Sequence, residues 1–243
     1  MNIAYSKPIT AMVRVLGLQA AARRVYYTVN RPSDGYFSAG IMGRMCKFRA
    51  GDPIELRTVE AAVLFERSIL ELILSEIRSG DLFLDVGANL GTFSVFAASF
   101  GARVVACEPE PIAVDRLAAN RDANQLDFQI VANALSDKEG TVSFAALAAN
   151  QIVQNSRISE TGTYAVRCIR GDSLNLQPNI VKVDVEGHEI HVLRGLKASL
   201  DRCRLCVVEV HDGVDWSHVE GELGSCGFTR FERLEGKLIG RRA

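Results

Sequence analysis

The chain has 243 residues, with 28 Lys and Arg against 29 Asp and Glu, and 48% of its residues are hydrophobic. This composition is typical of a globular protein, and the length suits one large α/β domain or two small ones. No apolar run approaches the ~20 residues of a membrane-spanning helix, so we expect no integral membrane protein. Six cysteines without a recognisable secretory signal predict reduced thiols and a cytoplasmic protein.

The balanced total charge conceals a basic first segment. Residues 1–50 carry eight basic groups and one acid and sum to +7, whereas the remaining 193 residues sum to −8. We predict that residues 1–50 form a basic, helical extension packed on an acidic main domain of residues 51–243. Peripheral contact of this extension with an anionic partner, such as a membrane surface or nucleic acid, is the alternative.

Apolar runs and turns alternate along the first half of the main domain. A stripe of period 3.6 predicts a helix at residues 54–77, and a strand follows at 82–86. After a glycine turn come a helix up to residue 100, a strand at 103–107 and a helix at 111–120. Because both strands are continuously apolar, we expect them inside a parallel sheet covered on both faces.

The same rhythm continues through the second half. The β-branched, Ser-rich pieces between residues 140 and 169 indicate antiparallel excursions off the main sheet. The pattern as a whole predicts one doubly wound α/β domain. Its remaining predicted elements are strands at 128–131, 180–185 and 205–210, a helix at 188–200, and a terminal hairpin of 228–233 and 237–240.

Ligands of an open parallel sheet bind beyond the carboxyl ends of its strands, where this sequence has Asp85, Glu108 and Asp184. The turn from Gly87 to Gly91 lacks the first glycine of the dinucleotide fingerprint, and Asp85 beside it repels phosphate. Glu108 stands about where an acid binds the two hydroxyls of a ribose. A ribose without a diphosphate, together with a positive group, indicates S-adenosylmethionine. Close helix-to-strand packing is the alternative role of the two glycines.

Several stretches resemble, in order and spacing, the FkbM family of S-adenosylmethionine-dependent methyltransferases. The resemblance covers about residues 60 to 212, and its motifs are Asp85–Gly91, Glu108–Pro111, Asn120, Ala134–Asp137, Gly140, Asp172–Leu174 and Val181–Glu189. It implies the class I methyltransferase fold, a Rossmann-like sheet of seven strands with the last antiparallel. It also implies O-methylation of a hydroxyl on a sugar, glycolipid or polyketide.

The resemblance further implies which residues bind the cofactor S-adenosylmethionine. It places the glycine-bearing turn at the methionine and sulfonium, the acid after the second strand at the ribose, and residues 134–135 at the adenine. The predicted cofactor-binding residues are Asp85, Gly87, Ala88, Asn89, Gly91, Thr92, Glu108, Pro109, Ala134, Leu135 and Asp184.

Charged residues recur with period 2 at the predicted strand 180–185. Lys182, Asp184 and Glu186 fall on one side of it, and charges on a buried strand are costly unless they pair or serve a site. We predict that Asp184 and Glu186 position the acceptor hydroxyl and accept its proton, with Lys182 as their counter-charge and His188 as a further base in reach. A structural ion pair of Lys182 with Asp184 is the alternative.

We predict a small-molecule, glycan or polyketide acceptor, no nucleic acid and no metal. His188 and His191, with Glu186 and Glu209, form an alternative divalent-metal site. A nucleic-acid methyltransferase that uses the basic residues 1–50 is a second possible function, although the paired-proline signature of amino-group methylation is missing after Asp184. An NAD-dependent oxidoreductase is the third. The pair of Cys203 and Cys206 is predicted to serve packing.

Overall fold

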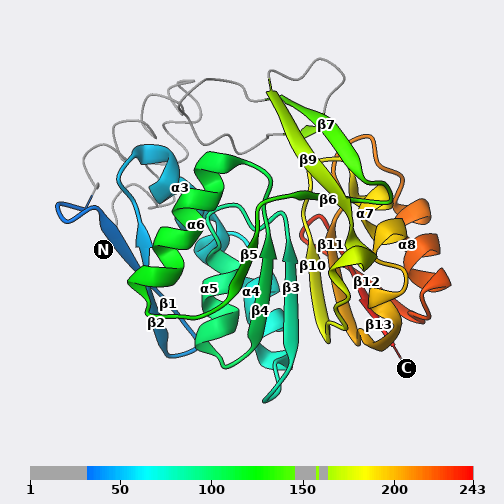
Figure 1. The fold of residues 1–243 in the computed structure, drawn as a ribbon. Coiled ribbons are helices and arrows are strands. Elements are labelled where there is room, and N and C mark those ends of the chain that lie inside the picture. Colours follow the sequence, from blue (N-terminus) through cyan, green and yellow to red (C-terminus); the bar gives the residue numbers. More distant parts are fainter. Residues whose placement is uncertain (1–31, 146–156, 159–163, 243) are drawn as a thin grey trace, which may run out of the picture.

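We describe the fold on a computed structural model, which defines residues 32–145, 157–158 and 164–242 (Figure 1). A seven-stranded sheet forms its centre, in the order β12-β13-β11-β10-β3-β4-β5. Strand β13 is antiparallel to both of its neighbours, whereas β5, β4, β3, β10 and β11 are parallel to one another. The predicted seven-stranded sheet with an antiparallel last strand is therefore confirmed. The strands are β3 (Leu82–Val86), β4 (Arg103–Cys107), β5 (Gln129–Val131), β10 (Ile180–Val183), β11 (Leu205–Glu209), β12 (Arg230–Leu234) and β13 (Lys237–Arg241).

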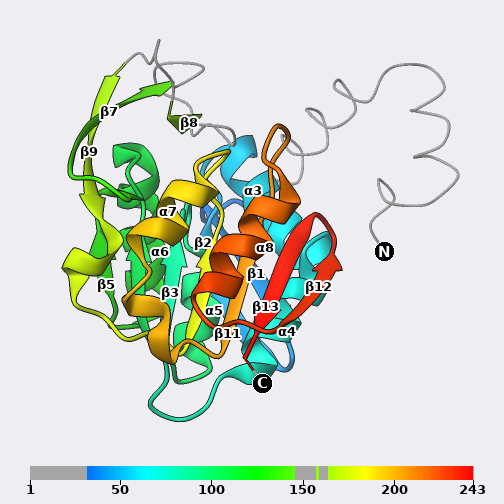
Figure 2. The ribbon, with the colours of Figure 1, turned by 90° about the vertical axis from the view of Figure 1, so that its right-hand side faces the viewer.

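Each face of this sheet has its own hydrophobic core, because successive side chains of a strand point to opposite faces. In β3, Phe83 belongs to one core, and Leu82 and Leu84 belong to the other. The first core packs against α3, α4, α5 and α6, and the second against α7 and α8, which lie on the near side of the sheet in Figure 2. The helices are α3 (Pro53–Leu64), α4 (Arg67–Glu76), α5 (Thr92–Ser99), α6 (Pro111–Ala123), α7 (Glu189–Gly195) and α8 (Trp216–Ser225).

The helix predicted at residues 54–77 is two helices. Asp52 begins α3 by accepting hydrogen bonds from the backbone of Ile54 and Glu55, and α3 ends before the exposed Phe65. The apolar stripe looks continuous in sequence, but Leu64 and Phe65 are exposed where the two helices meet, and both helices contribute buried residues to the first core. The helix α8 was not predicted. It buries Val219 and Leu223, which lie four residues apart.

Residues 36–49 form a hairpin, so the helical extension predicted over residues 1–50 is wrong for this part. Strands β1 (Tyr36–Ile41) and β2 (Arg44–Arg49) pair antiparallel. Their buried residues alternate with exposed ones, and Phe48 packs on Phe96 with ring centroids 5.5 Å apart. The many basic residues obscured this period-2 pattern. Residues 1–31 lie outside the described residues, and the anionic contact predicted for residues 1–50 and the boundary at residue 50 stay predictions.

A second, four-stranded sheet has the order β6-β9-β7-β8 and extends beyond the main sheet in Figure 1. The antiparallel pair of β7 and β9 confirms the excursion predicted between residues 140 and 169. No helix in the described part of the chain combines the length and the apolarity that crossing a bilayer requires. The strands of the second sheet are β6 (Ala134–Ser136), β7 (Gly140–Ala145), β8 (Arg157–Ile158) and β9 (Tyr164–Arg170).

Candidate active site

A pocket of about 320 Å³ opens at the carboxyl ends of β3, β4 and β10. All four predicted catalytic residues line it, as do nine of the predicted cofactor-binding residues. The other two, Asp85 and Gly91, do not belong to the lining. The predicted residues that line the pocket are Gly87, Ala88, Asn89, Thr92, Glu108, Pro109, Ala134, Leu135, Lys182, Asp184, Glu186 and His188.

The turn after β3, residues 87–91, is held in shape by its backbone, and we call it the donor turn. Gly87, Asn89 and Gly91 all have positive φ, at 78°, 50° and 79°. A side chain at Gly87 would collide with the backbone carbonyl of Asp184, and one at Gly91 would collide with the side chain of Leu117. Close packing therefore requires glycine at both positions, and their predicted part in cofactor binding stays a prediction.

Glu108 follows β4 and is the predicted ribose acid. Its Oε2 accepts a hydrogen bond from the backbone N–H of Asn89 at 2.8 Å, and its Oε1 accepts one from Glu110 at 2.9 Å. Burial raises the pKa of Glu108 to about 7, although these two hydrogen bonds lower it. Because each carboxylate oxygen has two lone pairs, both oxygens can still accept a hydroxyl from the pocket.

Asp85 and Lys182 lie side by side in the paired strands β3 and β10. Asp85 is fully buried, accepts a hydrogen bond from Ser94 Oγ at 2.6 Å, and lies 3.9 Å from Lys182 Nζ. Lys182 Nζ also donates to Asp184 Oδ2 at 2.9 Å and lies over the Phe93 ring. Burial lowers the pKa of Lys182, but Asp184 and Asp85 raise it further, so the net shift is upward. Lys182 is thus the counter-charge of two carboxylates.

Lys182 and Asp184 lie on one side of the chain, as predicted, and are in contact at 2.9 Å, but the regular strand does not continue to Glu186. Strand β10 ends at Val183, and Glu186 adopts a left-handed conformation with φ of 53°. The chain therefore leaves the sheet before Glu186, and this turn places the Asp184 and Glu186 side chains at the pocket. We call Asp184, Glu186 and Glu209, which all line the pocket, the acidic wall.

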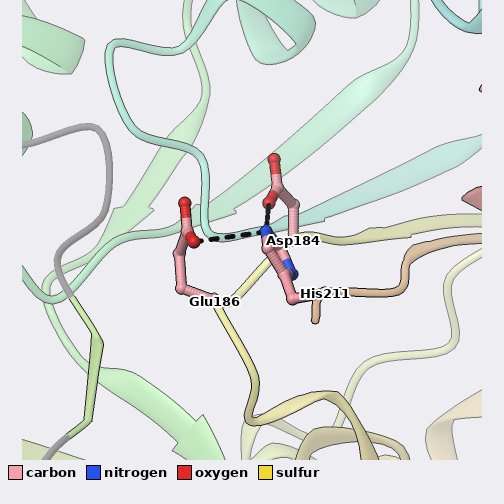
Figure 3. A group of neighbouring side chains, drawn as sticks. All are labelled: Asp184, Glu186 and His211. Atoms are coloured by element: carbon pink, nitrogen blue, oxygen red, sulfur yellow. Dashed lines mark ion pairs between the residues drawn. The ribbon is translucent and has the colours of Figure 1, made fainter. Parts of the chain in front are cut away.

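His211 was not predicted as a site residue; it follows β11 and lies beside Asp184 and Glu186 of the acidic wall (Figure 3). Its Nε2 is 3.3 Å from Glu186 Oε2, 3.7 Å from Asp184 Oδ1 and 3.9 Å from Glu209 Oε1, and its Nδ1 is 2.6 Å from Glu189 Oε1. Burial lowers the pKa of His211, but the hydrogen bond to Glu189 and the charges of Glu186 and Asp184 raise it to about 9. Its position just beyond a predicted strand was the signal that could have found it.

His188 lines the pocket but does not join His211. Its Nε2 lies 2.8 Å from Ser136 Oγ, and its ring stacks on His191 with centroids 4.5 Å apart. His191 in turn contacts Asp137 at 3.2 Å. Burial and the nearby His191 lower the pKa of His188 to about 4. The alternative metal set of His188 and His191 with Glu186 and Glu209 is therefore not brought together. Cys203 and Cys206 are fully buried in the second core, as predicted.

The sheet order, the glycine turn after its first strand and the acid after its second together define a class I S-adenosylmethionine-dependent methyltransferase. Residues 85–230, which make up more than half of the chain, match the Methyltransferase FkbM domain. The chain belongs to the FkbM methyltransferase family.

Two relatives agree with this assignment, and a solved structure shares the fold. The hexuronic acid methyltransferase AglP of Haloferax volcanii is 36% identical over 188 residues, which cover 73% of this chain and 77% of AglP. The 31-O-demethyl-FK506 methyltransferase FkbM of Streptomyces tacrolimicus is 27% identical over 188 residues, 61% of this chain and 70% of that protein. A putative S-adenosylmethionine-dependent methyltransferase from Streptococcus mutans shares the fold, with a TM-score of 0.53 and 12% identity over 96% of this chain and 65% of that one.

The residues of the pocket fit the cofactor of this class, S-adenosylmethionine. Asn89 Oδ1 is a buried acceptor at the pocket with no hydrogen-bond partner among the described residues, and a bound donor group would satisfy it. Glu108 has spare acceptor capacity for a ribose diol. Neither Asn89 nor Glu108 offers the positive charge that a pyrophosphate requires.

Proposed function

We propose that the protein transfers the methyl group of S-adenosylmethionine to a hydroxyl oxygen of a sugar or another polyhydroxylated small molecule. One observation carries this proposal: a single pocket joins Glu108, a suitable ribose acceptor, to the acidic wall of Asp184, Glu186 and Glu209. Two relatives support it, because their names describe methylation of a hexuronic acid and of a demethylated FK506.

The two sides of the pocket divide the chemistry. Because β3 separates β4 from β10, Glu108 and Asp184 extend from strands about 10 Å apart across the sheet. When bound, S-adenosylmethionine supplies a methyl group attached to a sulfonium. The C–S bond breaks as a C–O bond forms, and the sulfur leaves as a neutral thioether. Alignment of the two reactants in a pocket that excludes water contributes about 7–11 kcal/mol to such a reaction.

On this proposal the residues of the chain act as follows. Glu108 accepts hydrogen bonds from the ribose hydroxyls, and Asn89 accepts one from a donor group of the cofactor. Lys182 holds Asp184 in place through their 2.9 Å contact. Asp184 and Glu186 orient the acceptor hydroxyl, and its proton leaves towards the acidic wall as the oxygen attacks.

Two other functions were predicted from the sequence, an oxidoreductase and a nucleic-acid methyltransferase. Membership of a methyltransferase family argues against the NAD-dependent oxidoreductase. A nucleic-acid acceptor depends mainly on residues 1–31, outside the described part of the chain, and a small-molecule acceptor remains our proposal.

All six cysteines lie in the described residues as free thiols, and this supports the proposed cytoplasmic location.

The test incubates purified protein with methyl-labelled S-adenosylmethionine and four classes of acceptor: glycans that contain hexuronic acid, neutral sugars, a macrolide polyketide, and transfer RNA. We expect label in a glycan or small molecule, attached as a methyl ether by mass spectrometry. Label in RNA alone, or on nitrogen, would overturn the proposal. Glu108→Ala is expected to abolish labelling through loss of cofactor binding, and the matched surface variant Asp115→Asn, exposed on α6, is expected to retain it.

A further inference from the structure

Three side chains beside the pocket bring oxygen and nitrogen atoms together in a way that suits a metal ion. Asp184, Glu186 and His211 each offer one ligand atom, and these atoms all lie within 4.8 Å of one another (Figure 3). The distances from His211 Nε2 are 3.3 Å to Glu186 and 3.7 Å to Asp184. Ligands bound at about 2.0–2.2 Å from one ion lie about 3–3.5 Å apart, so only small movements are needed.

A fourth residue orients the histidine for this task. Glu189 is fully buried, and its Oε1 accepts hydrogen bonds from Gly187 N–H at 2.9 Å and from His211 Nδ1 at 2.6 Å. This contact directs Nδ1–H at Glu189, so a metal would bind at Nε2 and displace the proton that the raised pKa of His211 keeps there near neutral pH. A carboxylate behind a metal-binding histidine is the usual support of such ligands.

Glu189 also supplies an observation independent of the three ligands. Its Oε2 is buried without a hydrogen-bond partner among the described residues. A buried carboxylate with an unpartnered oxygen is costly unless positive charge lies nearby. The protonated His211 supplies one positive charge beside Glu189, and a divalent cation in place of its Nε2 proton would supply two.

The lysines of the site leave this position open. Lys182 donates to Asp184 Oδ2, the oxygen other than the one that lies near His211. Lys237 pairs with Glu209 Oε2 at 3.1 Å and with Glu66 at 3.5 Å. Asp184 Oδ1 and the Glu186 carboxylate therefore face His211 with no lysine of the described residues between them.

We propose that Asp184, Glu186 and His211 bind one divalent transition-metal ion. Two carboxylates and one imidazole form a mixed oxygen and nitrogen set that suits ions such as Mn²⁺. The sequence predicted that no metal binds, with a site at His188 and His191 as the alternative. The site proposed here differs from both predictions. Asp184 and Glu186 also line the pocket, so an open position of the ion faces it.

The role of the ion rests on the proposed function. An acceptor hydroxyl bound at the open position would lose its proton towards the acidic wall more readily, because the cation stabilises the alkoxide. The oxygen would then form the C–O bond as the C–S bond of the donor breaks. The two carboxylates would thus act on the hydroxyl through the ion.

The test measures Mn²⁺ binding by the metal-stripped full-length protein without the methyl donor. Binding removes the electron paramagnetic resonance signal of free Mn²⁺, and we expect one ion per chain. His211→Asn and Asp184→Asn are each expected to weaken the affinity at least about tenfold, and Glu189→Gln by about 10–100-fold as a supporting residue. His218→Asn, a histidine exposed on α8, is the matched control and is expected to bind like the wild type.

Each outcome bears on the proposal. Wild-type protein that takes up no Mn²⁺, or a folded His211→Asn variant with unchanged affinity, would overturn it. Should circular dichroism show that His211→Asn does not fold, His211→Asp, which keeps an oxygen ligand, is expected to fold and retain binding. Methyl transfer that persists unchanged in chelator, without Mn²⁺ binding, would refute the metal site alone. Bound Mn²⁺ without methylation of any hydroxyl would refute the proposed function alone.

Discussion

The donor turn, residues 87–91, and the acidic wall form two sides of one pocket, yet the first is shaped by backbone and the second by side-chain charge. Three positive φ angles and two close approaches fix the donor turn. The acidic wall depends on Lys182, Lys237 and His211, which come from three different strands or strand ends. A substitution in the donor turn should therefore act through sterics, and one at the acidic wall through charge.

The largest effect is expected from Gly87→Ala, which tests whether steric contacts shape the donor turn. The new side chain would need positive φ and would collide with the Asp184 backbone. We expect a loss of about 4 kcal/mol in the free energy of unfolding, measured by urea denaturation. Gly80→Ala has the same sign of φ but open space around the new atom, so it should cost only about 1–2 kcal/mol. Equal losses in the two variants would show that the close approach is not limiting.

The next effect tests charge at the acidic wall. Lys182→Met would leave Asp85 and Asp184 without their buried partner, at an expected cost of about 3 kcal/mol in unfolding free energy. Arg67→Met is the control, because its pair with Glu71 is solvent-exposed and should contribute less than about 1 kcal/mol. Similar losses from both substitutions would contradict the structural role of Lys182.

A smaller effect is expected at Glu108, on the side of the pocket proposed to bind the methyl donor. In Glu108→Gln the neutral amide would accept hydroxyls more weakly and would turn its NH₂ group towards a backbone N–H, so donor affinity should fall about tenfold, or about 1.4 kcal/mol. Isothermal titration calorimetry measures this change, with Asp115→Asn as the control.

The same residue predicts a pH dependence. Burial raises the pKa of Glu108 to about 7 in the free protein. Hydroxyl donors favour its ionised form, so binding lowers this pKa and donor affinity should fall as the pH decreases from about 8 to about 6. The variant Glu108→Gln should lose this dependence. A wild-type affinity that stays flat over the range would remove Glu108 from the ribose site.

The smallest effect is expected outside both sides of the pocket. His191 is 44% exposed in its contact with Asp137. His191→Asn should change the unfolding free energy by about 0.5 kcal/mol or less and leave donor affinity unchanged. A clear loss of donor binding in this variant would extend the donor site to the stacked histidine pair.

Local composition was enough to predict the centre of the fold. The strands at residues 82–86 and 103–107 have the bounds expected from their apolar runs, because a buried parallel strand must be apolar on both faces. The donor turn and Glu108 were predicted for a similar reason. Each lies directly after such a strand, so their order in sequence already placed them at one edge of the sheet.

The rest was decided by contacts between distant segments. The hairpin of residues 36–49 is held by Asn120 of α6 and by Asn124, the residue directly after it, which accept hydrogen bonds from the backbone of Arg49 and Lys47. Strand β10 ends at Val183 because the chain turns out of the sheet before Glu186, and no local pattern marked that turn.

His211 shows the same division most clearly. The sequence by itself determined the sheet, the donor turn and the acids at its edge, because these follow from short-range patterns of apolar residues and glycine. Only the tertiary structure joined His211 to Glu189, 22 residues earlier in the chain, and aimed its Nε2 at Asp184 and Glu186. The orientation of a side chain depends on the partners that the fold brings to it, and those partners are not neighbours in the sequence.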